Sequence, residues 1–253
     1  MMTVNVTNDK LVLLIALRRT ISGEGGPTAK DLLKTSILGI FSQIFKITDI
    51  GEEERATKLE SLWILTNLAL GDKNDVLKIL EPQYEVIDII KQVFSGDDYT
   101  MIESVFLLLN NIVAENSRFR DLILSKTELT NTINKILEGQ KISISLLGKM
   151  CEVLAKMFEF KGFSKYDAES GLKVARAGID TEDLDIIKHS LWIIRYLVDT
   201  RDDQMIIYVA QQDLIHNVLH LMGSNDFSVR TLALQIMSQI LCVKDTTIID
   251  CCL

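Results

Sequence analysis

The sequence predicts an all-α protein built as a solenoid of helical repeats, and three observations predict it. The 253 residues include only two prolines, and 47% of them are hydrophobic, which is the composition of a folded helical chain rather than of a disordered one. Apolar residues recur three and four positions apart, as they do on one face of an amphipathic helix. One such helical segment also returns at a nearly constant step, which is the mark of a repeat protein.

The recurring segment is an apolar helix. Its copies cover 60–69, 105–114 and 189–198, with a weaker copy at 232–241 and an earlier one at 15–20. The positions that we take as equivalent are Asn67, Asn111, Lys156, Tyr196 and Gln239. They are 44, 45, 40 and 43 residues apart, a step typical of armadillo or HEAT repeats with two or three helices each.

Between the copies the chain carries polar breaks and shorter helices. Breaks such as 71–75 and 199–203 follow an apolar copy, and short loops such as 223–226 precede the next one. No long linker interrupts this order, so we expect about six repeats in a single domain over 1–253. We expect a turn between helices at 23–27, and we expect 160–180 to be the most irregular stretch.

Composition excludes several functions. The formal net charge of −8 disfavours nucleic acid as a partner, because phosphates are neutralised by Lys and Arg. No apolar run approaches the ~20 residues of a membrane span, so no membrane partner is expected. The four cysteines form no Cys-x-x-Cys pair, which favours a reducing compartment. His216 and His220 have no evident third ligand, so we expect no metal. Without a phosphate loop or a nucleophile elbow, we expect no enzyme, no catalytic residue and no cofactor.

The segment Leu59–Gly71 places Trp63 four residues before Asn67 and ends on a glycine. This segment resembles the armadillo domain of the importin-α family, the nuclear-import adaptors, in which a helix carries Trp-x-x-x-Asn. The part of the chain around Asn111 and the segment 192–199, in which Tyr196 takes the place of Asn, resemble further repeats of that family. The resemblance implies an armadillo-repeat right-handed superhelical solenoid of about six repeats.

The resemblance also implies the binding residues. It assigns an extended basic peptide, a nuclear localisation signal, to a concave groove lined by Trp63, Asn67, Gly71, Asn111, Glu115, Trp192 and Tyr196. In the family, an acidic residue at the position of Glu115 pairs with the key lysine of the peptide, and the backbone of a glycine at the position of Gly71 approaches the same lysine.

The chemistry of the Trp-x-x-x-Asn pattern can be stated independently of the family. Residues four apart share one face of a helix, so Trp63 and Asn67 project together. A carboxamide can hold both a C=O and an N–H of an extended peptide. A tryptophan ring beside it can flank the stem of a lysine or arginine and attract its cation, at about 0.5–2 kcal/mol.

The array departs from the family pattern at three positions. Leu107 stands where the family has a tryptophan, and Glu152 and Lys156 stand where it has a tryptophan and an asparagine. A lysine that faces the groove repels a basic peptide. An alternative therefore stays open, in which the chain is a divergent armadillo scaffold that binds another protein without recognising a nuclear localisation signal.

Partners and location follow from the resemblance alone. It implies a basic peptide or protein cargo, and a protein of the cytoplasm and nucleus. In the family, a segment that binds importin-β precedes the repeats. We therefore expect this chain to be truncated at both ends relative to the family, and we expect contacts with other transport factors to involve termini that it lacks.

Overall fold

The structure is a computed structural model that describes residues 6–21, 26–48, 51–114, 116–139, 142–200 and 202–243. Within these ranges all regular structure is helical, with fifteen α-helices, one 3-10 helix and no strand. The predicted all-α class is confirmed. The chain divides into two compact units, Met1–Leu129 and Thr130–Leu253, and each is described by itself. The single domain that we expected over 1–253 stays a prediction.

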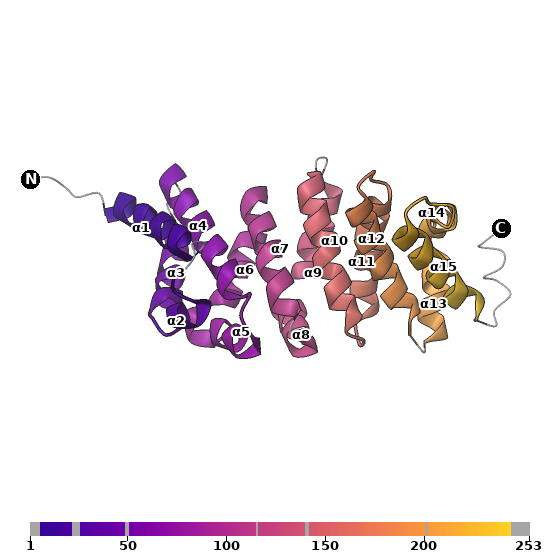
Figure 1. The fold of residues 1–253 in the computed structure, drawn as a ribbon, viewed down its shortest axis with the longest axis horizontal. Coiled ribbons are helices and arrows are strands. Elements are labelled where there is room, and N and C mark those ends of the chain that lie inside the picture. The colour runs from indigo at the N-terminus through magenta and orange to yellow at the C-terminus, as the bar shows by residue number, and fades with distance from the viewer. Residues whose placement is uncertain are drawn as a thin grey trace, which may run out of the picture. The chain divides into compact units, whose positions relative to one another are not determined.

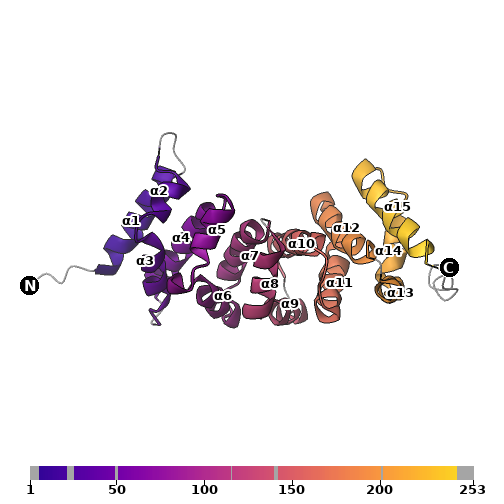
Figure 2. The ribbon, with the colours of Figure 1, turned by 90° about the horizontal axis from the view of Figure 1, so that it is seen from below.

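The first unit contains eight α-helices and the 3-10 helix among its described residues. They are α1 (Val6–Ile21), α2 (Ala29–Leu33), α3 (Ile37–Phe45), α4 (Glu52–Leu68), α5 (Lys73–Ile79), η1 (Pro82–Tyr84), α6 (Val86–Ser95), α7 (Tyr99–Val113) and α8 (Ser117–Lys126). The three long helices α1, α4 and α7 carry the apolar copies predicted from the sequence. In both views α4 lies between α1 and α7 (Figures 1 and 2).

The second unit follows the same plan. Its helices are α9 (Leu129–Glu138), α10 (Ile144–Glu159), α11 (Lys165–Ile179), α12 (Leu184–Val198), α13 (Asp203–Ala210), α14 (Leu214–Leu221) and α15 (Phe227–Leu241). Here α10, α12 and α15 carry the equivalent positions Lys156, Tyr196 and Gln239, and α12 packs between the other two (Figures 1 and 2). The six helices α1, α4, α7, α10, α12 and α15 follow one another at about the predicted step and make about six repeats, as predicted.

Aspartates cap the long helices α7, α12 and α15, and two of these aspartates also bind a basic residue of the preceding long helix. The carboxylate of Asp98 accepts hydrogen bonds from two first-turn N–H groups of α7. The same carboxylate accepts hydrogen bonds from two guanidinium nitrogens of Arg55 on α4, Nε at 2.5 Å and Nη2 at 3.0 Å. In the second unit Lys188 of α12 lies 3.3 Å from the carboxylate of Asp226, which caps α15. These ion pairs tie α4 to the start of α7 and α12 to the start of α15.

The expectation of an irregular stretch at 160–180 is wrong, because α11 occupies most of it. Ser164 caps this helix and exchanges hydrogen bonds with Asp167. Its buried side includes two glycines, which let neighbouring side chains approach closely. A Cβ atom on Gly171 would lie 2.7 Å from Cζ of Phe158, and one on Gly178 would lie 2.9 Å from Sγ of Cys151. A helix that packs through glycines lacks part of the apolar spacing that reveals other helices. Most of the expected turn at 23–27 lies outside the described residues.

Candidate functional site

Trp63, Asn67 and Asn111 define what we call the first-unit face. All three are half-buried, on α4 and α7, while the neighbouring Leu62, Leu65 and Leu68 are fully buried. The amide nitrogen of Asn67 donates to the carbonyl oxygen of Trp63 over 2.8 Å, within α4. That of Asn111 donates to the carbonyl oxygen of Thr66 over 2.9 Å and so joins α7 to α4.

These bonds use only part of each asparagine. A carboxamide has one acceptor oxygen and two N–H donors. In Asn67 and in Asn111, one side-chain N–H donates to a backbone carbonyl oxygen, and this bond fixes the orientation of the amide. The acceptor oxygen and the second N–H are the groups that a peptide main chain requires. The first-unit face therefore presents two oriented amides beside one indole ring.

The ring of Trp63 already has a cation over it. The guanidinium carbon of Arg18 on α1 lies 5.6 Å from the ring centroid, within the range of a cation–π interaction. The Nε atom of Arg18 lies 3.0 Å from the Oε2 atom of Glu60, one turn before Trp63 on α4. The side chains of Arg18 and Glu60 are 38% and 19% exposed, so this cluster lies at the edge of the surface.

Gly71 lies in the turn that follows α4, and its local surroundings explain its lack of a side chain. A Cβ atom at this position would lie 2.8 Å from Cγ of Asp75 and closer still to its Oδ2. The carboxylate of Asp75 accepts a hydrogen bond from the backbone N–H of Asp72, the capping residue of α5. Gly71 thus makes room for the start of α5, and its predicted approach to a ligand stays a prediction.

Two further positions of the predicted array belong to α7 and its end. Leu107 is half-buried on α7, one turn before Asn111. An aliphatic side chain there cannot supply the second aromatic face that the family pattern has. Glu115, the predicted partner of a peptide lysine, lies outside the described residues.

The second unit has its own set of predicted residues, Glu152, Lys156, Trp192 and Tyr196, which we call the second-unit face. The rings of Trp192 and Tyr196 stack on each other, with centroids 5.2 Å apart and planes at 27°. Trp192 is 38% exposed. Burial raises the pKa of the half-buried Tyr196. The two rings therefore form one stacked pair on α12, with Trp192 exposed and Tyr196 half-buried.

Charge on the second-unit face is mixed. The carboxylate of Glu152 lies 3.9 Å from Nζ of Lys156 and 3.4 Å from Nζ of Lys149. His189 of α12 is half-buried near this group, and burial lowers its pKa against the pull of the Glu152 and Asp185 carboxylates. Lys156 thus lies in an ion pair on α10, where the sequence predicts an isolated repelling charge.

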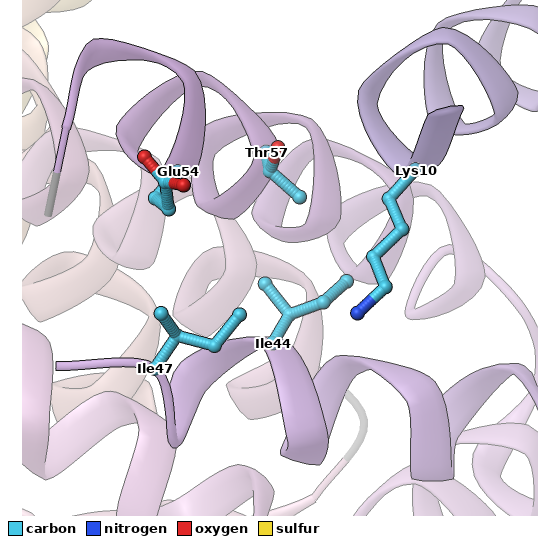
Figure 3. Close-up of a pocket in the computed structure, with 5 residues that line it drawn as sticks. All are labelled: Lys10, Ile44, Ile47, Glu54 and Thr57. Atoms are coloured by element: carbon cyan, nitrogen blue, oxygen red, sulfur yellow. The ribbon is translucent and has the colours of Figure 1, made fainter. Parts of the chain in front are cut away.

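A cavity of about 10 Å³ lies between α1, α3 and α4, lined by Lys10, Ile44, Ile47, Glu54 and Thr57 (Figure 3). The side chain of Lys10 reaches down from α1 into this gap (Figure 3). That volume is about the size that one water molecule needs. Within the described ranges, no group of three or more His, Cys, Asp or Glu side chains is arranged to hold a metal ion. None of the helices described is long and apolar enough to cross a membrane.

Sequence reasoning missed Arg18 and Glu60 as members of this site. Arg18 and Arg19 are too few to form a basic tract, so their charges alone do not indicate a binding site. The repeat period could have indicated Arg18, because this residue precedes Trp63 by 45 residues, one step of the repeat. Side chains one step apart lie on neighbouring long helices, and α1 packs against α4.

Comparisons with solved structures decide the fold. A designed armadillo repeat protein superimposes with a TM-score of 0.75 at 15% identity, covering 92% of this chain and 98% of the other. A second one, in complex with the peptide (KR)4, gives a TM-score of 0.74 at 15% identity, covering 94% of this chain and all of the other. The chain is a divergent armadillo-repeat domain.

Sequence comparisons add a distant relationship. No family model matches the chain. The armadillo-repeat domain is 21% identical to importin subunit alpha-2 of Arabidopsis thaliana over 189 residues, 74% of this chain and 34% of that protein. It is also 21% identical to importin subunit alpha-1b of Oryza sativa subsp. japonica over 203 residues, 79% of this chain and 36% of that protein. The domain thus spans about a third of the length of these curated relatives.

Proposed function

We propose that this armadillo-repeat domain binds an extended peptide rich in lysine and arginine, and that it serves as an importin-α-like nuclear transport adaptor. The proposal places the peptide backbone along the first-unit face and the protein in the cytoplasm and nucleus. The observation that carries it is the pair of oriented amides, Asn67 and Asn111, beside the ring of Trp63. An extended peptide matches this arrangement because its main-chain groups pair with amides while its side chains lie against the ring.

Two further findings support a basic rather than an acidic peptide. The ring of Trp63 accommodates a guanidinium group, since Arg18 lies over it. The comparisons point the same way, because one structural neighbour is in complex with the peptide (KR)4 and two sequence relatives are importin α subunits.

Titration of a fluorescein-labelled decapeptide of alternating lysine and arginine tests the proposal, with an acidic decapeptide as the control ligand. We expect Trp63→Ala and Asn67→Ala to weaken binding of the basic peptide by tenfold or more, because aromatic anchors and main-chain contacts dominate such interfaces. Leu77→Ala, an exposed position on the short helix α5, is the matched control and should bind as the parent does. Affinity should also fall as salt rises, because exposed charges are screened.

Equal affinity for the acidic peptide would reject the proposal, and so would a Trp63→Ala protein that binds normally. The second-unit face favours the other function considered for this chain, a scaffold that binds a protein other than a nuclear signal. There, two lysines share the carboxylate of Glu152, and the two aromatic rings stack on each other. Two results together would support this second function. The domain would not bind the basic peptide, and Trp192→Ala would weaken its binding to a partner protein.

A further inference from the structure

On the first-unit face, a cation from the protein itself lies over the ring of Trp63. Arg18 on α1 places its guanidinium carbon 5.6 Å from the centroid of the Trp63 ring. The helices α1 and α4 pack against each other in both views (Figures 1 and 2). The contact therefore comes from two packed helices of the same unit, which hold Arg18 over the ring.

A carboxylate holds the same guanidinium. The Nε atom of Arg18 and the Oε2 atom of Glu60 lie 3.0 Å apart, and both atoms are shielded from solvent. Glu60 precedes Trp63 by three residues, so the carboxylate and the ring share one face of α4. An aromatic face with a carboxylate beside it is the environment that binds an arginine or lysine of a partner. Here an arginine of the chain fills it.

We propose that Arg18 is the specificity-determining residue of the first-unit face, because it competes with the peptide for the place over Trp63 and beside Glu60. This inference rests on the proposed peptide binding. A lysine or arginine of the peptide enters that place only by displacing Arg18, and while Arg18 stays it repels the incoming charge. A peptide with a neutral or acidic residue at that position leaves Arg18 in place, and an acidic residue gains a cationic partner.

The neighbouring Arg19 provides a matched control. It carries the same charge on the same helix, one position further along, and it is exposed. Replacing Arg18 or Arg19 therefore changes the net charge equally. Only replacement of Arg18 uncovers the ring of Trp63 and releases the carboxylate of Glu60.

The first measurement uses no peptide. The chain has two tryptophans, so Trp192→Phe leaves Trp63 as the single fluorescent indole. Caesium ions quench an indole that cations can reach. We expect Arg18→Ala, and also Arg18→Gln, which keeps much of the side-chain length, to raise the caesium quenching constant of Trp63 about twofold or more. Arg19→Ala should leave it near the parent value. Circular dichroism confirms that each variant is folded.

The second measurement titrates the same proteins with the alternating lysine–arginine decapeptide. We expect Arg18→Ala to bind it about three- to tenfold more tightly than Arg19→Ala does, the range of one exposed to half-desolvated cation–π contact. A series of peptides, each with glutamate in place of a different basic residue, locates the position that faces Arg18. At that position the glutamate should be tolerated by the parent and disfavoured by Arg18→Ala.

The outcomes separate this inference from the proposed function. Unchanged caesium quenching in both Arg18 variants overturns the inference, because Arg18 then does not cover the ring. Raised quenching with equal peptide affinity for the Arg18 and Arg19 variants also overturns it, because Arg18 then does not compete. If no variant binds the basic peptide at all, the proposed function fails, and the competition inferred for Arg18 fails with it, while the quenching still measures whether Arg18 covers Trp63.

Discussion

The side-chain amide of Asn111 on α7 donates a hydrogen bond to the main-chain carbonyl oxygen of Thr66 on α4, over 2.9 Å. Asn67 stands one repeat earlier, and its amide donates to the carbonyl oxygen of Trp63 within its own helix. The two asparagines are equivalent in the repeat but support the fold differently. Asn111 connects two helices, whereas Asn67 bonds to a carbonyl in the preceding turn of the same helix.

This difference predicts unequal losses of stability. Asn111→Ala should lower the free energy of unfolding by about 1 kcal/mol, because it removes a part-buried hydrogen bond between α7 and α4. Asn67→Ala should cost only a few tenths of that, since α4 keeps its own backbone bonds without it. Urea unfolding followed by circular dichroism measures both values. Equal losses in the two variants would contradict the structural distinction drawn between them.

Gly71→Ala tests whether this glycine is needed for the fold. The added Cβ would lie 2.8 Å from Cγ of Asp75, so Asp75 must move away from the start of α5. We expect a loss of about 1–3 kcal/mol, as for other substitutions that overpack a site. Gly39→Ala on α3 is the control, because nothing lies within 4 Å of its Cβ position and alanine favours helix. A Gly71→Ala protein as stable as Gly39→Ala would show that Asp75 has room to move.

Lys58 is a lysine inside the core of the first unit, 2% exposed on α4. Its Nζ donates to the carbonyl oxygen of Ile47, just beyond the end of α3, over 2.8 Å, and lies 5.5 Å from the ring centroid of Phe45. Burial lowers the pKa of Lys58 from its ordinary value of 10.5, while Glu54 opposes the change. The side chain thus donates a hydrogen bond to a carbonyl oxygen near the end of α3 from a buried position.

The lowered pKa predicts how stability changes with pH. Between the folded-state pKa and the higher unfolded-state value, the unfolded chain binds more protons, so the free energy of unfolding rises as pH rises through that window. We expect the parent to gain stability relative to Lys58→Met as pH rises toward the ordinary lysine pKa of 10.5, because the methionine variant lacks this proton. Urea titrations at a series of pH values measure the difference. A difference that stays constant with pH would mean that Lys58 is as free to titrate in the fold as in the unfolded chain.

The long helices could be predicted from the sequence because their buried residues are apolar and regularly spaced. Residues such as Leu62, Leu65 and Leu68 are buried along one side of α4, and buried apolar residues three and four apart recur in α7, α10, α12 and α15. The helix α11 escaped prediction for the opposite reason. Part of its packing depends on Gly171 and Gly178, where the absent side chain makes the contact, so the hydrophobic spacing is interrupted.

The candidate site was predictable only where its residues share a helix. Trp63 and Asn67 are four residues apart, so their common face follows from helix geometry. Arg18 and Trp63 are 45 residues apart, and their contact depends on how α1 packs on α4, which a single sequence does not specify. The same holds for the bond from Asn111 to Thr66. The pairing of Lys156 with Glu152 was within reach, because the two residues are four apart on one helix.

That pairing changes what to expect of Lys156→Asn on the second-unit face. One carboxylate, Glu152, lies between Lys149 and Lys156, so the two lysines share one partner. Asparagine removes the positive charge of Lys156 and adds an amide that can pair with a peptide main chain. We expect affinity for the alternating lysine–arginine decapeptide to rise about two- to fivefold at low salt, the contribution of one exposed charge pair.

Lys173→Asn on α11 is the matched control for this prediction. Lys173 also forms an ion pair with a glutamate four residues away, Glu169, at 3.1 Å, but it lies on a helix that carries no predicted binding residue. The two variants change the net charge equally, so only a charge next to the ligand should distinguish them. The gain for Lys156→Asn should shrink as ionic strength rises, because exposed charges are screened over about 8–10 Å. Equal affinities for the two variants at low salt would mean that a basic peptide does not contact the second-unit face at Lys156.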